Sequence, residues 1–412
     1  MPKKLWETSP HLALRAGSDF ALEGLDRSST PGFSGDRADG QERMKERGEL
    51  LDDLQERLFA DGKHGGTRSV LLVIQGLDTA GKGGIVRHVM GMVDPQGISL
   101  ASFGVPTKEE LAHHYLWRIK KKLPQPGKIG VFDRSHYEDV LVARVDKLVE
   151  ENVWRKRYAE INRFEKRIVD SGTTIIKVAL MCSKEEQAGR ILERIERPDK
   201  RWKHNPGDLD TRDKWDAYQE AYQDVFRLTS TDYAPWYVIP ADKKWYARVA
   251  ITELLTQALI DIDPQWPKPR WQVAVQRRRL LATVDPALVD DLENAVAEQL
   301  LEAKEEHGDF LATKEAVAQL AEVDNGDRAP TIEDVAEENG TQDSAADDVA
   351  VTAKSAKSKS GNGAKVKKAG SGSKKKDKKK KKKKDKKKKL KKKGKKSPLF
   401  SPLVRGLLYR LC

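Results

Sequence analysis

The sequence predicts an α/β fold in which helices cover a mostly parallel sheet. Short apolar runs rich in branched residues alternate with segments whose apolar residues recur at helical spacing. A glycine-rich loop, residues 76–84, directly follows the first apolar run, residues 69–75. Strands that alternate with helices are typical of parallel sheets covered on both faces. Ligands of such sheets bind beyond the carboxyl ends of the strands, so the loops there are the candidate functional regions.

The expected elements follow one another in a regular order. An amphipathic helix at residues 41–60, with apolar residues at roughly helical spacing, precedes the first strand. Further strands are expected at residues 98–103, 128–132, 173–180 and 236–240. Helical patterns separate and follow them at residues 108–122, 154–171, 183–196, 213–229 and 243–260.

Composition divides the chain into five parts. Residues 1–40 contain few apolar residues and form an N-terminal extension, and residues 41–263 form the compact domain. Residues 264–301 form a helical C-terminal extension, at whose start three prolines, Pro264, Pro267 and Pro269, interrupt the chain. Residues 302–353 are an acidic linker that we expect to be disordered, and residues 354–412 are a Lys-rich, low-complexity tail.

Net charge and cysteine content restrict the class of protein. The formal charge of +13 is unevenly distributed, because residues 354–396 hold 25 lysines against 2 aspartates, whereas residues 302–348 hold 15 acidic against 3 basic side chains. With two cysteines far apart in sequence, neither a disulfide framework nor a cysteine-rich metal site is expected. Because no apolar run is long enough to span a bilayer and no secretory signal begins the chain, we expect a cytoplasmic protein.

The loop at residues 76–84 matches the phosphate-binding pattern G-x-x-x-x-G-K, with Gly76, Gly81 and Lys82 at its fixed positions. Glycines let backbone N–H groups converge on phosphate oxygens, and the following helix and lysine add positive charge. A plain glycine-rich turn is the alternative, but the preceding strand and following helix argue against it. We include Gly83 and Arg87 among the expected phosphate-binding residues.

The residue after the lysine departs from the usual pattern. Ordinary loops of this kind place a Mg²⁺-binding hydroxyl there, whereas this chain has Gly83. Asp78, within the loop, is the natural substitute because carboxylate oxygens suit hard cations. A second carboxylate, Asp133, ends an apolar strand and is followed by Arg134, which offers donors to a phosphate. Capping of strand and helix is the alternative for this pair. The sequence therefore predicts Asp78 and Asp133 as metal ligands, and Asp78, Lys82, Asp133 and Arg134 as catalytic residues.

A group of cations continues from a helix into a loop and predicts a lid over a polyanion at about residues 190–212. Its members are Arg190, Arg194, Arg197, Lys200 and Lys203, and the three arginines share a helix face. A solvated charged helix is the alternative, since neighbouring glutamates could pair with the arginines.

Several motifs together resemble the family-2 polyphosphate kinases, in the branch of polyphosphate:nucleotide phosphotransferases. They are the loop at residues 76–84, the segment at 95–113, the block Asp-Arg-Ser-His-Tyr-Glu-Asp at 133–139, the lid cations, and the segment at 234–246. The resemblance covers about residues 18–263. It implies a fold like that of thymidylate kinase with a helical lid, and reversible transfer of a phosphoryl group between polyphosphate and a nucleotide.

Carried over by position, Asp78 and Asp133 would manage Mg²⁺, Lys82 and Arg134 would grip the transferring phosphoryl, and the lid cations would close over it. The chain departs from the resemblance at Gly83, where this branch often has Asp, which puts metal use or nucleotide preference in doubt. As partners we expect inorganic polyphosphate, a nucleoside mono- or diphosphate, and further copies of the chain.

Two other functions remain open at this point. An ATP-dependent nucleotide kinase could use the same fold, although the missing loop hydroxyl and the cation-rich lid argue against it. A nucleic-acid-binding protein could act through the Lys-rich tail, because lysine runs bind polyanions without reading sequence. The tail could equally contact polyphosphate or serve only to keep the protein soluble.

Overall fold

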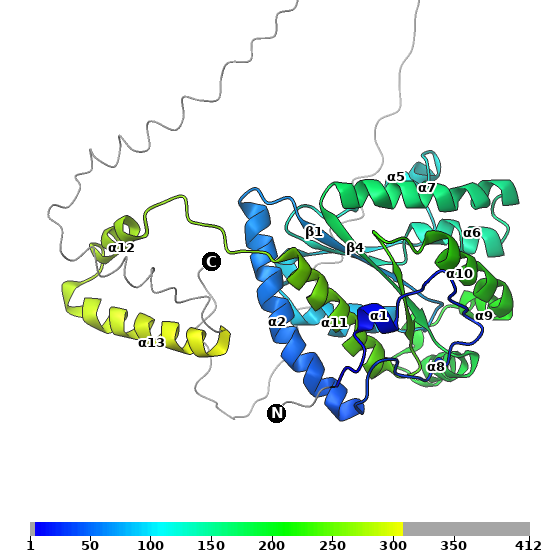
Figure 1. The fold of residues 1–412 in the computed structure, drawn as a ribbon, viewed down its shortest axis with the longest axis horizontal. Helices are drawn as coiled ribbons and strands as arrows, with labels where there is room; N and C mark the ends of the chain where they lie inside the picture. Colours follow the sequence, from blue (N-terminus) through cyan, green and yellow to red (C-terminus); the bar gives the residue numbers. More distant parts are fainter. Residues whose placement is uncertain (1–4, 308–412) are drawn as a thin grey trace, which may run out of the picture. The chain divides into compact units, whose positions relative to one another are not determined.

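The computed structural model describes residues 5–307. Within them, parallel strands form one five-stranded sheet in the order β2-β3-β1-β4-β5 (Figure 1). The strands are β1 (Ser69–Gln75), β2 (Ile98–Ser102), β3 (Ile129–Asp133), β4 (Thr173–Met181) and β5 (Trp236–Pro240). The expected α/β class with a parallel sheet is confirmed, and each strand limit lies within one residue of its prediction.

The helices connect and cover these strands. They are α1 (Pro10–Ala13), α2 (Arg37–Lys63), α3 (Lys82–His88), α4 (Lys108–Leu111), α5 (Leu116–Lys120), α6 (Val142–Val145), α7 (Glu151–Asp170), α8 (Lys184–Glu196), α9 (Gly207–Asp213), α10 (Trp215–Thr229), α11 (Lys244–Ile262), α12 (Val273–Leu281) and α13 (Val289–His307). Short 3₁₀ turns add η1 (Met90–Met92), η2 (Pro95–Gly97), η3 (His136–Asp139), η4 (Arg201–Lys203) and η5 (Pro286–Leu288).

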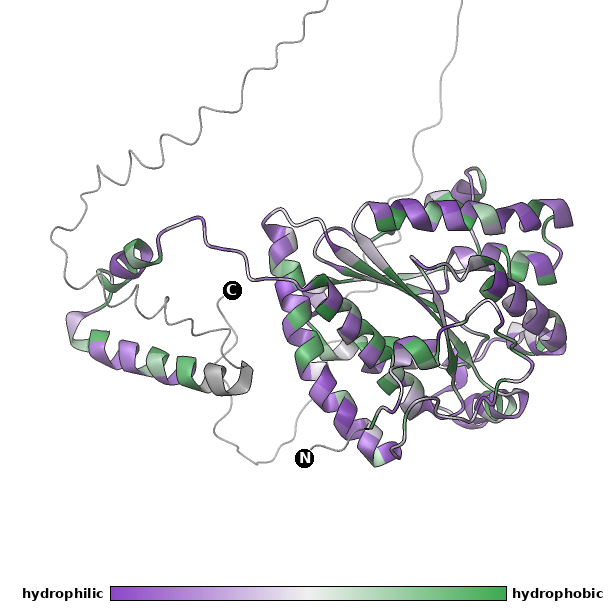
Figure 2. Ribbon diagram, viewed as in Figure 1, coloured by the Kyte–Doolittle hydropathy of each residue, from purple (hydrophilic) through white to green (hydrophobic). Residues whose placement is uncertain are grey.

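The sheet separates two hydrophobic cores, and β1 contributes to both because side chains alternate along a strand. Val70, Leu72 and Ile74 pack in the core that contains the buried residues of α2 and α11. Leu71 and Val73 pack in the core that contains those of α7 and α10. All seven residues of β1 are buried, which explains why its sequence is apolar on consecutive positions. In Figure 2 the strands are correspondingly mostly hydrophobic, whereas the covering helices have mixed hydropathy.

The N-terminal segment packs against the edge strand β5. The backbone N–H of Ala16 donates to the carbonyl of Trp236, and the N–H of Val238 donates to the carbonyl of Leu14. Leu14, Ala16, Leu22 and Phe33 are buried. This segment therefore covers backbone groups that an edge strand would otherwise leave unpaired.

One helical prediction was wrong in detail. The segment predicted at residues 108–122 is two short helices, α4 and α5, rather than one. The segment predicted at 213–229 is confirmed as α10, which begins at Trp215, after α9 ends at Asp213.

The predicted helical extension ended at residue 301, whereas α13 continues to His307. The rest of the predicted acidic linker, residues 308–353, and the Lys-rich tail lie outside the described residues. The division of the chain into five parts therefore stays a prediction. Among the helices that the structure describes, none is long and apolar enough to cross a membrane.

Candidate active site

The glycine-rich loop follows the carboxyl end of β1 and leads directly into α3. Gly76 and Gly81 have φ angles of +152° and +120°, which residues with a Cβ rarely adopt. A Cβ at Gly76 would also lie 2.9 Å from the carbonyl oxygen of Leu180 in β4. Glycine is therefore required at Gly76 by both the backbone turn and the close approach of the neighbouring strand.

Lys82, the first residue of α3, points back over this loop. Its Nζ donates to the carbonyl oxygens of Gly76 at 2.7 Å and Leu77 at 3.3 Å, and it lies 3.8 Å from Oδ1 of Asp78. The side chain is only 9% exposed. A lysine held over a glycine-rich turn at the start of a helix is an arrangement that binds phosphate oxygens.

An ion pair joins this loop to the loop after β3. Nη2 of Arg134 donates to Oδ1 of Asp78 at 2.6 Å. Burial by itself would raise the pKa of the Asp78 carboxyl, but Lys82 and Arg134 outweigh burial and hold that pKa below its ordinary value. Asp78 is therefore ionised at neutral pH, when it can pair with Arg134 or with a metal ion.

Asp133 lies beside this pair because of the register of the sheet. It stands opposite Ile74 in the parallel ladder between β1 and β3, two positions before Gly76. Within the described side chains, its carboxylate accepts no hydrogen bond and forms no ion pair, although the charge of Arg134 acts on it. Asp133 thus offers oxygen atoms that the protein itself does not occupy.

These residues line one cleft of about 910 Å³ at the carboxyl ends of the strands. Its walls bring together most of the predicted site residues, namely Asp78, Gly81, Lys82, Gly83, Arg87, Asp133, Arg134, Arg190, Arg194, Lys200 and Lys203. Two predicted residues are not in its walls. One is Gly76, and the other is Arg197, which pairs with Glu193 and Asp199.

The charge of the cleft is strongly positive. Its lining includes nine Lys and Arg side chains against three carboxylates. Like charges on the walls of a cleft focus the field and attract anions. The cleft is therefore suited to hold a ligand with several negative charges.

The family model for polyphosphate kinase 2 matches residues 34–266, the part of the chain that builds the sheet and the cleft. The chain belongs to the polyphosphate kinase 2 family. It is 47% identical over 250 residues to an AMP/ADP-polyphosphate phosphotransferase of Meiothermus ruber, covering 61% of this chain and 92% of the relative. It is 39% identical over 256 residues to an ADP-polyphosphate phosphotransferase of Rhodopseudomonas palustris, covering 58% of this chain and 87% of the relative.

A solved structure, polyphosphate kinase 2 from Arthrobacter aurescens, is similar in both fold and sequence. The TM-score is 0.66 at 48% identity, covering 68% of this chain and 98% of that one. The family expected from the sequence motifs is confirmed, and with it the expectation of a phosphotransferase.

The lid cations of this polyphosphate kinase 2 chain differ in how firmly the protein holds them. Arg194 pairs with Asp208 at 3.2 Å, and Lys200 pairs with Glu193 at 2.5 Å. Within the described side chains Lys203 has no carboxylate partner, and its Nζ lies 5.0 Å from the ring centroid of Trp202. A polyanion would therefore have to compete with Asp208 and Glu193 for two of the lid cations.

Arg190 is used differently from the other arginines of α8. It is 5% exposed, and its guanidinium donates to the carbonyl oxygens of Thr79, Ala80, Ala241 and Asp242 and to Glu186. It thus joins the phosphate-binding loop to the segment after β5. Its predicted role as a phosphate ligand stays a prediction, but its visible contacts are those of a clamp that holds the loop.

Two cations of the cleft were absent from the predicted site. Lys244 and Arg248 lie one turn apart on α11 and line the cleft beside the phosphate-binding loop. The signal in the sequence was their four-residue spacing at the start of the helix that follows β5. That helix begins at the same edge of the sheet as α3, and only the strand order places the two helix starts together.

Steric crowding does not require the glycine at position 83, where the family resemblance leads us to expect aspartate. A Cβ built on Gly83 would meet no heavy atom within 4 Å among the described residues. An aspartate would therefore fit there. The glycine therefore leaves the start of α3 with one negative charge fewer than an aspartate would give it.

Proposed function

We propose that this polyphosphate kinase 2 chain reversibly transfers a phosphoryl group between inorganic polyphosphate and a nucleoside mono- or diphosphate, with Mg²⁺. The observation that carries the proposal is the excess of cations around the loop that holds Lys82, with Asp133 beside it. The two relatives named for phosphotransfer between polyphosphate and AMP or ADP support both acceptors. The finer site assignments below belong to this proposal.

The main barrier to this reaction is repulsion between two polyanions that meet end to end. A nucleotide phosphate is already ionised at neutral pH, so no strong general base is needed to activate it. Lys82 and Arg134 flank the position where the transferring group would lie, and they neutralise the charge that builds on its oxygens. Because one phosphoanhydride replaces a similar one, the equilibrium lies near balance and the reaction runs in either direction.

The residues of the cleft fit a magnesium ion. Mg²⁺ is usually held by one or two carboxylates together with substrate phosphates and water. Among the described residues no side chain occupies the carboxylate oxygens of Asp133, and Asp78 lines the same cleft in its ionised form. Bound Mg²⁺ would neutralise phosphate charge, and a chelator should abolish turnover.

A second cavity of about 540 Å³ extends the proposed path of polyphosphate. It shares His88, Lys244 and Arg248 with the cleft and adds Arg37 and Lys243. Burial and then Arg37 lower the pKa of Arg248, while burial followed by Arg248 and Arg87 lowers that of His88. These cations therefore repel one another, and a chain of phosphates lying along them would relieve that repulsion.

The decisive experiment supplies long-chain polyphosphate as the sole phosphoryl donor. Purified full-length protein is incubated with polyphosphate, Mg²⁺ and separate nucleoside mono- and diphosphates, and the products are resolved by anion-exchange chromatography. We expect a nucleoside diphosphate from AMP and a triphosphate from ADP. Turnover with ATP as donor but none with polyphosphate would instead favour an ATP-dependent nucleotide kinase.

The proposed reaction also implies where and how the protein works. Because its substrates are nucleotides and Mg²⁺, we propose that it acts in the cytoplasm, and that it does so as a homo-oligomer. Light scattering of the full-length protein would measure the oligomeric state. Comparing DNA binding with and without the Lys-rich tail would test the proposed contact with nucleic acid.

A further inference from the structure

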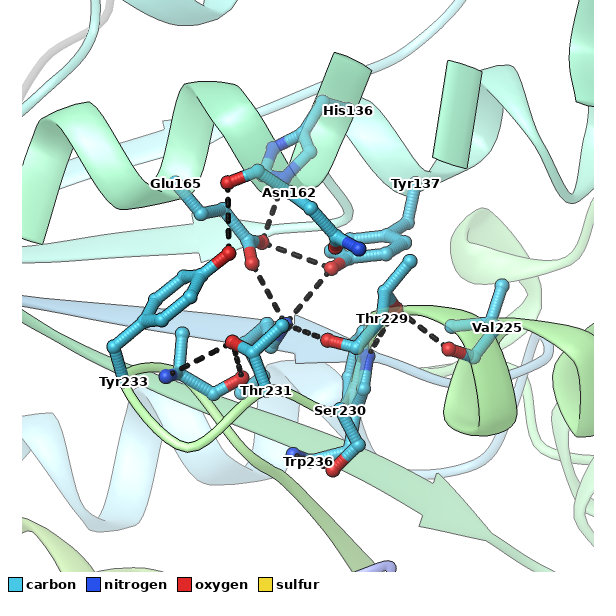
Figure 3. Close-up of polar contacts among 12 residues, drawn as sticks. His136, Tyr137, Asn162, Glu165, Val225, Thr229, Ser230, Thr231, Tyr233 and Trp236 are labelled. Atoms are coloured by element: carbon cyan, nitrogen blue, oxygen red, sulfur yellow. Dashed lines mark hydrogen bonds and ion pairs between the residues drawn. The ribbon is translucent and has the colours of Figure 1, made fainter. Parts of the chain in front are cut away.

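A group of buried polar side chains lies beneath the loop that follows β3. Lys177 of β4 and Glu165 of α7 form an ion pair at 2.7 Å, and both side chains are fully buried. His136 Nε2 and Tyr137 OH reach Oε1 of the same glutamate at 3.1 and 2.9 Å. Figure 3 shows His136 and Tyr137 directed toward Glu165. We call these four residues the buried cluster.

Stability alone does not explain why the buried cluster carries charges. The free energy needed to remove two ions from water usually exceeds what their attraction contributes. Well-packed apolar residues in their place often stabilise a protein equally well. Lys177 stands in the middle of a strand whose other residues are apolar apart from Thr173 and Thr174, and it is one of the largest fully buried side chains among the described residues. All three of its donors are used, on Glu165, Tyr137 and the carbonyl oxygen of Thr229. Such a network specifies one arrangement of the elements that contribute to it, although Nδ1 of His136 has no hydrogen-bond partner among the described residues.

The buried cluster is continuous in sequence with the active-site loop. His136 and Tyr137 begin η3, and they follow directly after Asp133, Arg134 and Ser135. The other end of η3 is held to α7, because Arg157 donates to the carbonyl oxygen of Asp139 at 2.8 Å. The loop after β3 is therefore anchored through η3 by side chains that do not line the cleft themselves.

Arg134 needs such an anchor because its backbone is strained. Its φ angle is +64°, in the left-handed region that non-glycine residues avoid. Its N–H donates to the carbonyl oxygen of Ile74 at 3.1 Å, and its guanidinium reaches Asp78. Strained residues persist only where the surrounding structure over-determines their conformation.

We propose that the buried cluster positions Arg134 for phosphoryl transfer by holding η3 against α7 and β4. His136, Tyr137, Glu165 and Lys177 are positioning residues, which act through Arg134 without contact with substrate. The inference rests on the proposed function for its kinetic consequences. The structural part of the inference is that the cluster maintains the strained backbone of Arg134 and its pairing with Asp78. This part does not depend on which substrate is used.

The test replaces three of the four cluster residues by apolar residues of similar size, in the triple variant Tyr137→Phe, Glu165→Leu and Lys177→Met. We expect it to fold, and its kcat with polyphosphate and ADP to fall about 100-fold, because a small misplacement of a reacting group has that effect. The KM for polyphosphate should change little. A matched control, Arg43→Met, Arg47→Met and Glu253→Leu, removes a buried carboxylate and its two arginines between α2 and α11 and should keep kcat.

A double-mutant cycle distinguishes positioning from general destabilisation. If the buried cluster acts through Arg134, the triple substitution should reduce kcat no further in an Arg134→Ala background. Additive losses would overturn the proposal, as would a folded triple variant with normal kcat. Should the triple variant not fold, the single variant Glu165→Gln, which keeps the side-chain shape, is put through the same cycle and decides the question.

A crystal structure of the triple variant, or of Glu165→Gln if the triple variant does not fold, gives a readout that needs no activity. We expect the Arg134 guanidinium to leave Asp78 and the backbone φ to relax from +64°. An unchanged Arg134 would overturn the positioning role even if kcat fell. If the wild-type protein does not turn over polyphosphate, the proposed function fails, and this structural comparison still decides whether the buried cluster positions Arg134.

Discussion

Nη2 of Arg134 lies 2.6 Å from Oδ1 of Asp78, so the loops after β1 and β3 meet in a direct ion pair. The two residues are 56 positions apart in sequence, and the ladder between β1 and β3 brings them together. The pair links the backbone that would surround a phosphate to the strand end that carries Asp133. Several consequences of this junction can be measured.

Lys82→Ala and Asp133→Asn should each lower kcat for nucleotide formation from polyphosphate by about 100-fold or more, as expected when one stabilising group is removed from a charged transition state. Folding should be preserved, because among the described residues Lys82 has polar contacts only with its own loop and the Asp133 side chain has no polar partner. Circular dichroism checks the fold, and chromatography of the products measures turnover. Near-normal turnover in either variant would refute its assigned role.

Arg134→Gly should be more stable than Arg134→Ala by about 1 kcal/mol, because alanine retains the penalty of a left-handed backbone and glycine does not. Both variants lose the pairing with Asp78, so their difference isolates the strain at φ +64°. Urea denaturation measures both free energies of unfolding. Equal stabilities would mean that the backbone relaxes in the alanine variant. We expect both variants to keep only a small but measurable residual kcat.

Glu138→Gln should stabilise the protein at neutral pH. Burial is the main cause that raises the pKa of the Glu138 carboxyl above its ordinary value of 4.5, although Arg134 and Lys82 act in the opposite direction. The folded state therefore binds this proton more tightly than the unfolded state, and stability falls as pH rises from 4.5 through the raised pKa. The advantage of the glutamine variant should grow over that window and vanish below it. Melting temperatures at a series of pH values test this, and a constant difference would contradict it.

Arg190→Met should reduce the free energy of unfolding by about 3 kcal/mol, because it leaves several buried carbonyl oxygens without their donor. Arg197→Met is the matched control on the same helix, since Arg197 is exposed and pairs only with surface carboxylates. That control should leave the melting temperature unchanged. If Arg190→Met instead keeps full stability and only raises the KM for polyphosphate, Arg190 is a phosphate ligand rather than a clamp.

Lys244→Ala and Arg248→Ala should raise the KM for polyphosphate by about tenfold each, equivalent to roughly 1.4 kcal/mol of binding. Neither side chain has a hydrogen-bond or ion-pair partner among the described residues, so stability should not fall. The effect should weaken as salt increases, because partly exposed charges are screened. An unchanged KM with long-chain polyphosphate at low salt would show that polyphosphate does not bind along α11.

Local patterns along the chain were enough to predict the strands, the phosphate-binding loop and the carboxylates at the strand ends. Buried parallel strands are apolar on consecutive positions, and a turn with the conformation of Gly76 admits only glycine, so both leave a mark within a few residues. The family motifs then related Asp133, Arg134 and the lid cations to one reaction.

Other features depended on contacts between distant segments. Arg190 and Arg194 lie four residues apart on α8, yet their contacts differ. Arg190 donates to backbone carbonyl oxygens of two loops, whereas Arg194 forms an ion pair with Asp208. Lys244 and Arg248 join the cleft only because β5, which precedes their helix, is separated from β1 by β4 alone in the sheet order. In the sequence, Lys177 is a single lysine within a mostly apolar strand. Its partner Glu165 belongs to α7, so the ion pair becomes visible only in the tertiary structure. A single sequence records which residues are present, whereas the pairing of charges across the sheet is set by the packing of whole elements.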